Sequence, residues 1–278
     1  MKKIILIIIS FCALNLSAQP VDSLRKSHDF SLGTGYMQMM SSAFLPFGMP
    51  AVNIVADYQY FKQSKKHNKN YWGYWLKPQF SFLLTNEPRS PYYEQISPNI
   101  YRVELKTGGV WLRKMLIKSE KIRLFVGAGV SLNTEFNFAL SNSKLYYYYI
   151  PDLNWYFSPD FAMKAEYNFK KVQLKGEISL PVAMVGNYID QFHYVPVNID
   201  TCSIVKYKLT PNTFVFCNKI FQPSLSLTAK FPLNKNQNDK KKWFFLVKYV
   251  FESLDVNLKN FAERKEQHDI KIGFVCEM

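Results

Sequence analysis

The chain has 278 residues, of which 48% are hydrophobic and 17% aromatic, and it carries a formal net charge of +14 at pH 7. Beyond the first eighteen residues, even the most apolar stretches, such as 243–251, are interrupted by charge within about ten residues, which excludes a membrane-spanning helix. A membrane protein of this composition would therefore have to cross the bilayer as a closed sheet.

Residues 1–18, MKKIILIIISFCALNLSA, predict a secretory signal peptide. Two lysines precede an apolar run that ends at Leu14, and the segment closes on a small-residue pair at Ala18. The run is too short to cross roughly 30 Å of hydrocarbon as an anchor helix, which is the alternative. We expect one mature domain, residues 19–278. Because an exported chain rarely meets nucleic acid, the basic excess indicates anionic lipid head groups as partners.

Alternation of apolar and polar residues predicts ten β-strands in the mature chain. The clearest is KIRLFVGAGVSLNTEF, where every second residue from Ile122 to Leu132 is apolar and glycine or polar residues lie between them. The connections alternate between long or aromatic segments and short basic or polar ones. The predicted strands are 28–39, 51–61, 71–84, 100–112, 121–136, 155–169, 172–185, 222–231, 243–252 and 268–278.

This asymmetry of connections is typical of bacterial outer-membrane barrels, which have long outer loops and short periplasmic turns. We therefore predict an all-β fold, an antiparallel transmembrane β-barrel of ten strands, with eight or twelve as alternatives. The count depends on residues 186–221, where a further hairpin could protrude as an outer loop or join the wall. A connection of that length without any structure is uncommon.

Aromatic residues support this topology. Trp72, Trp111 and Trp243, together with Tyr58 and Tyr60, all fall near the predicted periplasmic ends of their strands. Aromatic residues scattered in a soluble core would have no reason to gather at one level. We expect these five to form an interfacial girdle.

Charged residues lie on the opposite face of the strands. Only two lysines separate the sixth and seventh predicted strands, which places Lys164 opposite Glu177 and Glu166 opposite Lys175. Each such cross-strand pair contributes about 0.2 to 1 kcal/mol. We expect a charged network that fills the lumen, rather than a wide water pore. Further inward residues are Arg102, Glu104, Lys106, Arg123, Asp160 and Asp269.

The residues "LSAQ" at the signal-peptide boundary, the alternating strands and the final strand "DIKIGFVCEM" resemble the small outer-membrane β-barrel proteins of Bacteroidota. The resemblance is architectural and covers most of the mature chain. It implies a place in the outer membrane, contact with outer-membrane lipid including lipopolysaccharide, and insertion by the barrel assembly machinery.

Candidate catalytic residues are few. Outer-membrane enzymes such as lipid A deacylases, palmitoyl transferases and omptin proteases place serine, histidine and carboxylate at the outer barrel rim. Only His193 and His268 fall near that side, each with an acid close by in the sequence, and no G-x-S-x-G elbow accompanies them. No phosphate loop, dinucleotide fingerprint or calcium loop is present, so we expect no cofactor. The scarcity of catalytic candidates favours a non-enzymatic role, and an enzyme stays open as the alternative.

Cys202 and Cys217 are candidates for a disulfide, since an oxidising compartment would let them pair. Closing a loop of that size would stabilise the fold by roughly 3 kcal/mol in the chain-entropy model. Two unpaired thiols are the alternative. A zinc site is not expected, because no CxxC or paired histidine spacing accompanies them.

Three functions remain open from the sequence. The leading hypothesis is a non-enzymatic outer-membrane barrel with a structural, adhesive or accessory role, or a narrow porin-like conduit. The second is a lipid- or peptide-cleaving hydrolase, which requires His193 or His268 within hydrogen-bond reach of a serine or acid. The third is a secreted soluble β-sandwich that binds a ligand, in which the apolar faces would meet inside two sheets.

Overall fold

The computed structural model describes residues 26–41, 45–63, 70–83, 99–115, 117, 121–140, 152–169, 172–187, 213–216, 220–233, 241–258 and 261–278. Within these ranges the chain forms strands only, and no helix there is long and apolar enough to cross a membrane. The strands are β1 (Lys26–Ser41), β2 (Leu45–Gln63), β3 (Asn70–Leu83), β4 (Asn99–Lys114), β5 (Ile122–Leu140), β6 (Asp152–Phe169), β7 (Val172–Pro181), β8 (Ala183–Asn187), β9 (Thr213–Phe216), β10 (Ile220–Phe221), β11 (Ser224–Pro232), β12 (Lys242–Leu258) and β13 (Phe261–Glu277).

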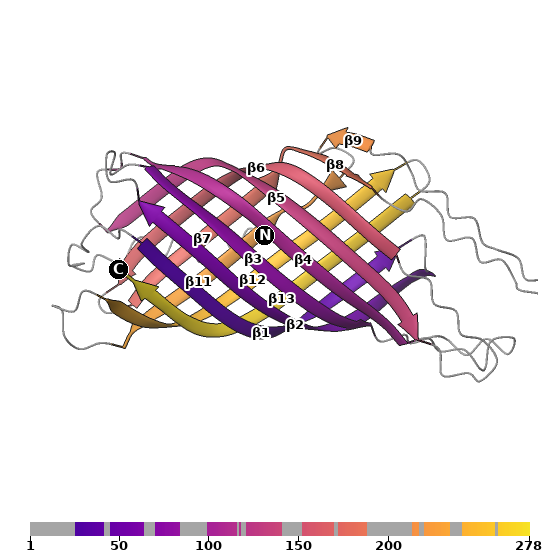
Figure 1. Cartoon of the computed structure of the whole chain (residues 1–278), viewed down its shortest axis with the longest axis horizontal. Coiled ribbons are helices and arrows are strands. Elements are labelled where there is room, and N and C mark those ends of the chain that lie inside the picture. The colour runs from indigo at the N-terminus through magenta and orange to yellow at the C-terminus, as the bar shows by residue number, and fades with distance from the viewer. Residues whose placement is uncertain are drawn as a thin grey trace, which may run out of the picture.

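All these strands belong to one antiparallel sheet that closes into a barrel (Figure 1). Closure is made by β1, which pairs with both β2 and β13, and by β5, which pairs with β6. β7 and β8 both pair with β6 and form a single wall strand that is interrupted at Val182. β9, β10 and β11 together fill the next position, between that strand and β12.

The barrel therefore has ten wall strands, as predicted, and the alternatives of eight and twelve are wrong. Residues 213–216 and 220–221, which the sequence left open as part of a further hairpin, continue the predicted strand 222–231 instead of adding a pair of strands. Their pairing with β8 and β12 fixes them in the wall.

The two ends of the barrel differ. We call one the turn end: it carries Lys26 and Met278, whose backbones exchange hydrogen bonds of 3.0 and 2.9 Å, and the short connection between β6 and β7. The other, the loop end, carries the long connections after β3, β5 and β8, together with short ones after β1 and β12. In Figure 1 the turn end, with the C-terminus, lies on the left. β2 and β5 have 19 residues each, more than the roughly 9–11 that cross a bilayer.

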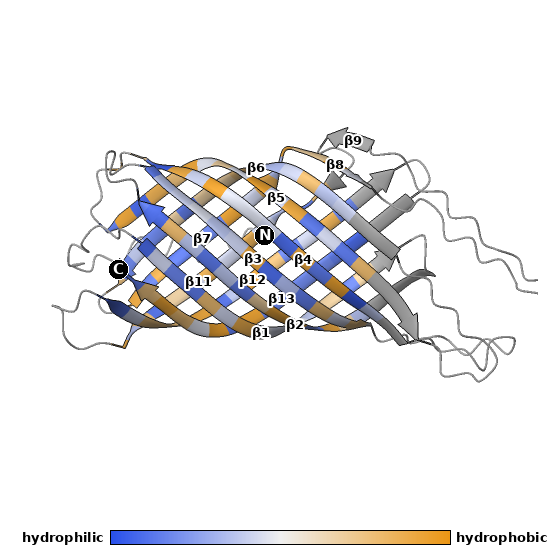
Figure 2. Cartoon of the chain, viewed as in Figure 1, coloured by the Kyte–Doolittle hydropathy of each residue, from blue (hydrophilic) through white to orange (hydrophobic). Residues whose placement is uncertain are grey.

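The outward face of the wall is apolar. Side chains along each strand alternate between the two faces, so apolar and polar residues alternate along the ribbons in Figure 2. Ile54 and Ile270 are 58% and 62% exposed, and Val130 and Leu132 of β5 also point outward. Because the apolar faces do not meet inside two sheets, the β-sandwich hypothesis is wrong.

An apolar cluster of described residues lies on the inward face, close to the turn end. Tyr71, Leu112, Phe125 and Ala162 pack there, with the rings of Tyr71 and Phe125 centred 4.8 Å apart. The rest of the inward face is predominantly polar or charged, which is the reverse of a soluble barrel.

The predicted register of β6 and β7 is confirmed. Lys164 lies opposite Glu177, and Glu166 lies opposite Lys175. The expected cross-strand ion pairs are replaced by pairs along each strand: Lys164 Nζ lies 2.7 Å from Glu166 Oε1, and Lys175 Nζ lies 2.8 Å from Glu177 Oε1. Residues two apart on a strand share a face, so both kinds of pairing are open to this group of four.

Candidate functional site

The lumen is crossed at mid-height by an ion pair between opposite walls. Lys106 of β4 contacts Glu252 of β12, and these two strands are five wall positions apart in either direction around the barrel. Both side chains are buried. Lys77 Nζ of β3 adds a second contact to Glu252 at 3.3 Å. The pair therefore bridges the full width of the lumen.

Glu104 is the centre of this mid-height network. Its carboxylate lies 3.0 Å from Lys106 Nζ and 2.6 Å from Lys265 Nζ, and it accepts a hydrogen bond of 2.9 Å from the Asn133 amide. The side chain is completely buried. Three strands, β4, β5 and β13, thus hold one carboxylate in place.

Further ion pairs extend the network around the lumen. Arg102 contacts Glu135, and Lys248 Nζ lies 2.5 Å from Asp57 Oδ2. The sequence prediction of inward charged side chains is confirmed for five buried residues and for the half-buried Arg123, which shares the face of Phe125. The five buried ones are Arg102, Glu104, Lys106, Asp160 and Asp269.

A second crossing lies nearer the turn end. Lys175 of β7 donates to Gln59 of β2 at 3.5 Å, and these strands are also on opposite walls. The ammonium groups of Lys164 and Lys175 each lie 4.6 Å from the centre of the Phe61 ring, within the range of a cation–π contact. The lumen is therefore bridged at two levels.

One side of the lumen is lined by small side chains and keeps open space. A cavity of about 140 Å³ lies along β5, β6, β7 and β11. Trp75 and Lys77 of β3 line its other side, where Lys77 Nζ lies 5.1 Å from the Trp75 ring centre. The hydroxyl and carboxyl groups that line the cavity are those of Ser131, Tyr156, Ser158, Asp160, Glu177, Ser179, Ser224, Ser226 and Glu252.

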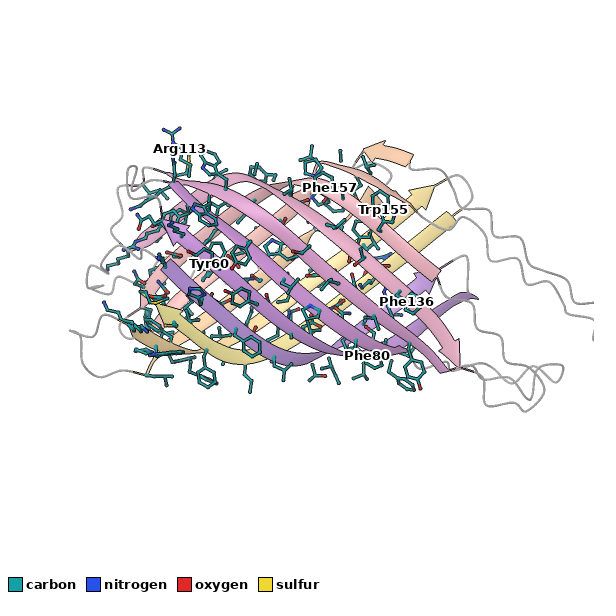
Figure 3. All side chains as sticks on the ribbon, in the orientation of Figure 1. Tyr60, Phe80, Arg113, Phe136, Trp155 and Phe157 are labelled. Carbon is teal, nitrogen blue, oxygen red and sulfur yellow. The ribbon has the colours of Figure 1, made fainter. Side chains whose placement is uncertain are left out.

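The predicted girdle residues lie on the outward face near the turn end. Trp72 and Trp111 are direct partners on β3 and β4, and Trp243 is the second residue of β12. All three are exposed. Their interfacial role stays a prediction. Figure 3 shows Tyr60 nearer this end, and toward the loop end it labels the aromatic residues Phe80, Phe136, Trp155 and Phe157.

His268 is on the outward face of β13, away from the lumen. Its Nδ1 lies 2.7 Å from the Tyr249 hydroxyl, and its ring packs on Phe251. Asp269 points to the opposite face and is buried in the lumen. In the described part of the chain, the contacts of His268 therefore include neither a serine nor a carboxylate.

Three predicted residues lie outside the described residues: His193, Cys202 and Cys217. A further cysteine, Cys276, is a free thiol on β13. Within the described ranges, no group of three or more histidine, cysteine, aspartate or glutamate side chains is arranged to hold a metal ion.

The comparisons with known proteins bear on the fold. The structure is similar to that of the outer membrane protease OmpT from Escherichia coli, with a TM-score of 0.55 and 11% identity over 95% of this chain and 99% of that one. It also matches the translocator domain of autotransporter NalP from Neisseria meningitidis, with a TM-score of 0.44 and 8% identity over 99% and 93% of the two chains. This is the fold of outer-membrane β-barrel proteins. No protein-family model and no curated protein matches the sequence.

Sequence reasoning missed the partners that lie across the lumen. Glu252, Lys265 and Lys248 all fall at inward positions of their strands, so strand periodicity could have marked them as lumenal. The hydroxyl-lined side could have been found in the same way. The contacts between inward residues on opposite walls depend on strand tilt and on side-chain length. A local sequence pattern does not determine them.

Proposed function

We propose that this protein is a non-catalytic barrel of the outer membrane, with a structural or accessory role and a lumen closed to bulk diffusion. One observation carries the proposal: Lys106 and Glu252 join opposite walls at mid-height, and Lys175 and Gln59 do so near the turn end. Wide-channel barrels are built from more strands and leave the lumen open.

Permeability tests this proposal. We expect liposomes that contain the folded protein to exclude glucose-sized solutes, so that they shrink and stay shrunken in a glucose medium. Replacing both partners of the mid-height crossing, with Lys106→Ser and Glu252→Ser, shortens two long side chains and should raise the rate of glucose entry. A matched control, Arg264→Ser with Glu266→Ser, removes an ion pair that lies outside the lumen. Rapid glucose entry through the wild-type protein would contradict a closed lumen.

The proposal includes export and lipid contact. The chain would lose residues 1–18, be inserted by the barrel assembly machinery, as in the Bacteroidota barrels it resembles, and meet lipid and lipopolysaccharide with its apolar outward face. Its support is the exposed band that contains Ile54, Val130 and Ile270. The folded protein should sediment with sarkosyl-insoluble outer membrane and migrate faster on a gel before boiling than after it. A soluble protein without this mobility shift would refute it.

A further inference from the structure

Asp160 differs from the other carboxylates of the lumen. Among the inward carboxylate side chains that the structure describes, each of the others has a lysine or arginine nitrogen within 4.0 Å, and Asp160 has none. The ion-paired ones are Asp29, Asp57, Glu104, Glu135, Glu166, Glu177, Glu252, Asp269 and Glu277. Asp160 is nevertheless buried, with 8% of its surface exposed.

Hydroxyl groups take the place of a cation. The Ser158 hydroxyl donates to Asp160 Oδ1 at 2.5 Å, and Ser131 and Ser179 line the same cavity beside this carboxyl group. The hydroxyl oxygens of Ser131 and Ser158 are themselves 2.7 Å apart. Asp160 therefore sits among serines from three wall strands, β5, β6 and β7.

The neighbours of Asp160 supply protons but no positive charge. Ser158 donates its one hydroxyl proton to the carboxylate, and Ser131 and Ser158 contact each other. Each hydroxyl oxygen also carries two lone pairs. Burying a carboxylate whose charge is not balanced is costly. One additional positive charge among these oxygens would remove that cost.

The backbone fixes the position of Asp160. It follows Pro159 and lies opposite Pro181, where β7 ends. Val182 interrupts the wall strand at this point, and its backbone N–H donates to the Pro159 carbonyl at 2.9 Å. Irregularities of this kind re-aim side chains and occur often next to functional sites. The cavity of about 140 Å³ runs past the cluster, so Ser131, Ser158, Asp160 and Ser179 all line open space.

We propose that Asp160 and the hydroxyls of Ser131, Ser158 and Ser179 bind a small monovalent cation of the alkali-metal type. All the ligand atoms are oxygens, which suit hard cations. The cluster has a single carboxylate, whereas sites for Ca²⁺ usually combine several oxygen ligands with more negative charge. This inference goes beyond the proposed function, because a bound ion does not require the lumen to conduct.

The test is sodium binding by the folded full-length barrel in detergent, measured as the line width of the ²³Na resonance. We expect saturable broadening by the wild-type protein, loss of the broadening when KCl is added, and no effect of the same concentration of choline chloride. Asp160→Asn keeps the size of the side chain and removes its charge, so it should abolish the saturable part. Glu266→Gln, which removes an outward charge, should leave it unchanged.

The midpoint of thermal unfolding provides a second readout. An ion that binds only the folded state raises this midpoint. At constant ionic strength, NaCl or KCl in place of choline chloride should raise the midpoint of the wild-type protein and of Glu266→Gln, but not of Asp160→Asn. If Asp160→Asn does not fold, Ser179→Ala serves in its place and should weaken binding at least several-fold. Equal midpoints in all three salts, or no saturable ²³Na broadening by the wild-type protein, would mean that Asp160 holds only a proton and would overturn the proposal. Neither readout depends on solute permeability, so this test and the liposome test can fail separately.

Discussion

Replacing Glu104 by glutamine should be among the most damaging conservative substitutions in this barrel. The carboxylate contacts Lys265 at 2.6 Å and Lys106 at 3.0 Å, and all three side chains are buried. Lys106 keeps its contact with Glu252 in the variant, whereas Lys265 loses the one carboxylate that contacts it in the described part of the chain. Leaving one buried charge without its partner costs about 3–5 kcal/mol, and we expect a loss of that size in the free energy of unfolding.

Urea unfolding of the protein in lipid vesicles, followed by tryptophan fluorescence, measures this loss. The double variant Glu104→Gln with Lys265→Met removes the stranded charge as well and should be more stable than Glu104→Gln alone. Glu266→Gln breaks the exposed pair with Arg264 and should cost no more than about 1 kcal/mol. If Glu104→Gln cost as little as Glu266→Gln, the lumen would have to be hydrated enough to screen its charges, and the argument for a closed lumen would be wrong.

Three further outcomes are expected. Ile272→Arg places a charge on the outward face. Urea titration in vesicles should show a loss of about 2–4 kcal/mol in the free energy of unfolding if this residue lies near the bilayer midplane. The loss should be much smaller if the outward face meets water instead of lipid. In a variant that keeps Trp111 as its one tryptophan, lipids brominated near the glycerol backbone should quench the fluorescence more than lipids brominated at the chain ends. The opposite order would place the girdle at the bilayer centre. His268→Ala removes the contact with Tyr249 and should change the free energy of unfolding by less than about 1.5 kcal/mol, because one hydrogen bond at an exposed site is lost; a total loss of function in a folded His268→Ala protein would revive the hydrolase hypothesis.

The wall of the barrel was predictable because it follows a period of two. β5 shows this best: its apolar residues from Ile122 to Leu132 face outward, as their alternation predicts, and Asn133 and Glu135 are buried in the lumen. The register of β6 and β7 was also predictable, since a connection of two residues leaves little freedom in how the strands align. Local patterns therefore determine the strands, their faces and their nearest neighbours.

The interior was not predictable in the same way. Lys106 and Glu252 are far apart in sequence and belong to opposite walls, so no local pattern pairs them. The continuation of β11 through β9 and β10 was missed because residues 213–221 contain short apolar runs with no sustained alternation. Asp160 stands out only by comparison with the ion-paired inward carboxylates of the described residues, and those pairs span the lumen.

The pairings inside the lumen also bear on how the barrel is assembled. Lys106 and Glu252 are 146 residues apart, and Lys248 and Asp57 are 191 apart. An open sheet in which β1 and β13 have not yet met would hold these charges apart, exposed on one side and without partners. Contacts between distant parts of a chain form late and slowly. Sealing of the β1–β13 seam and neutralisation of the interior should therefore occur as one cooperative event, so that half-closed intermediates are short-lived.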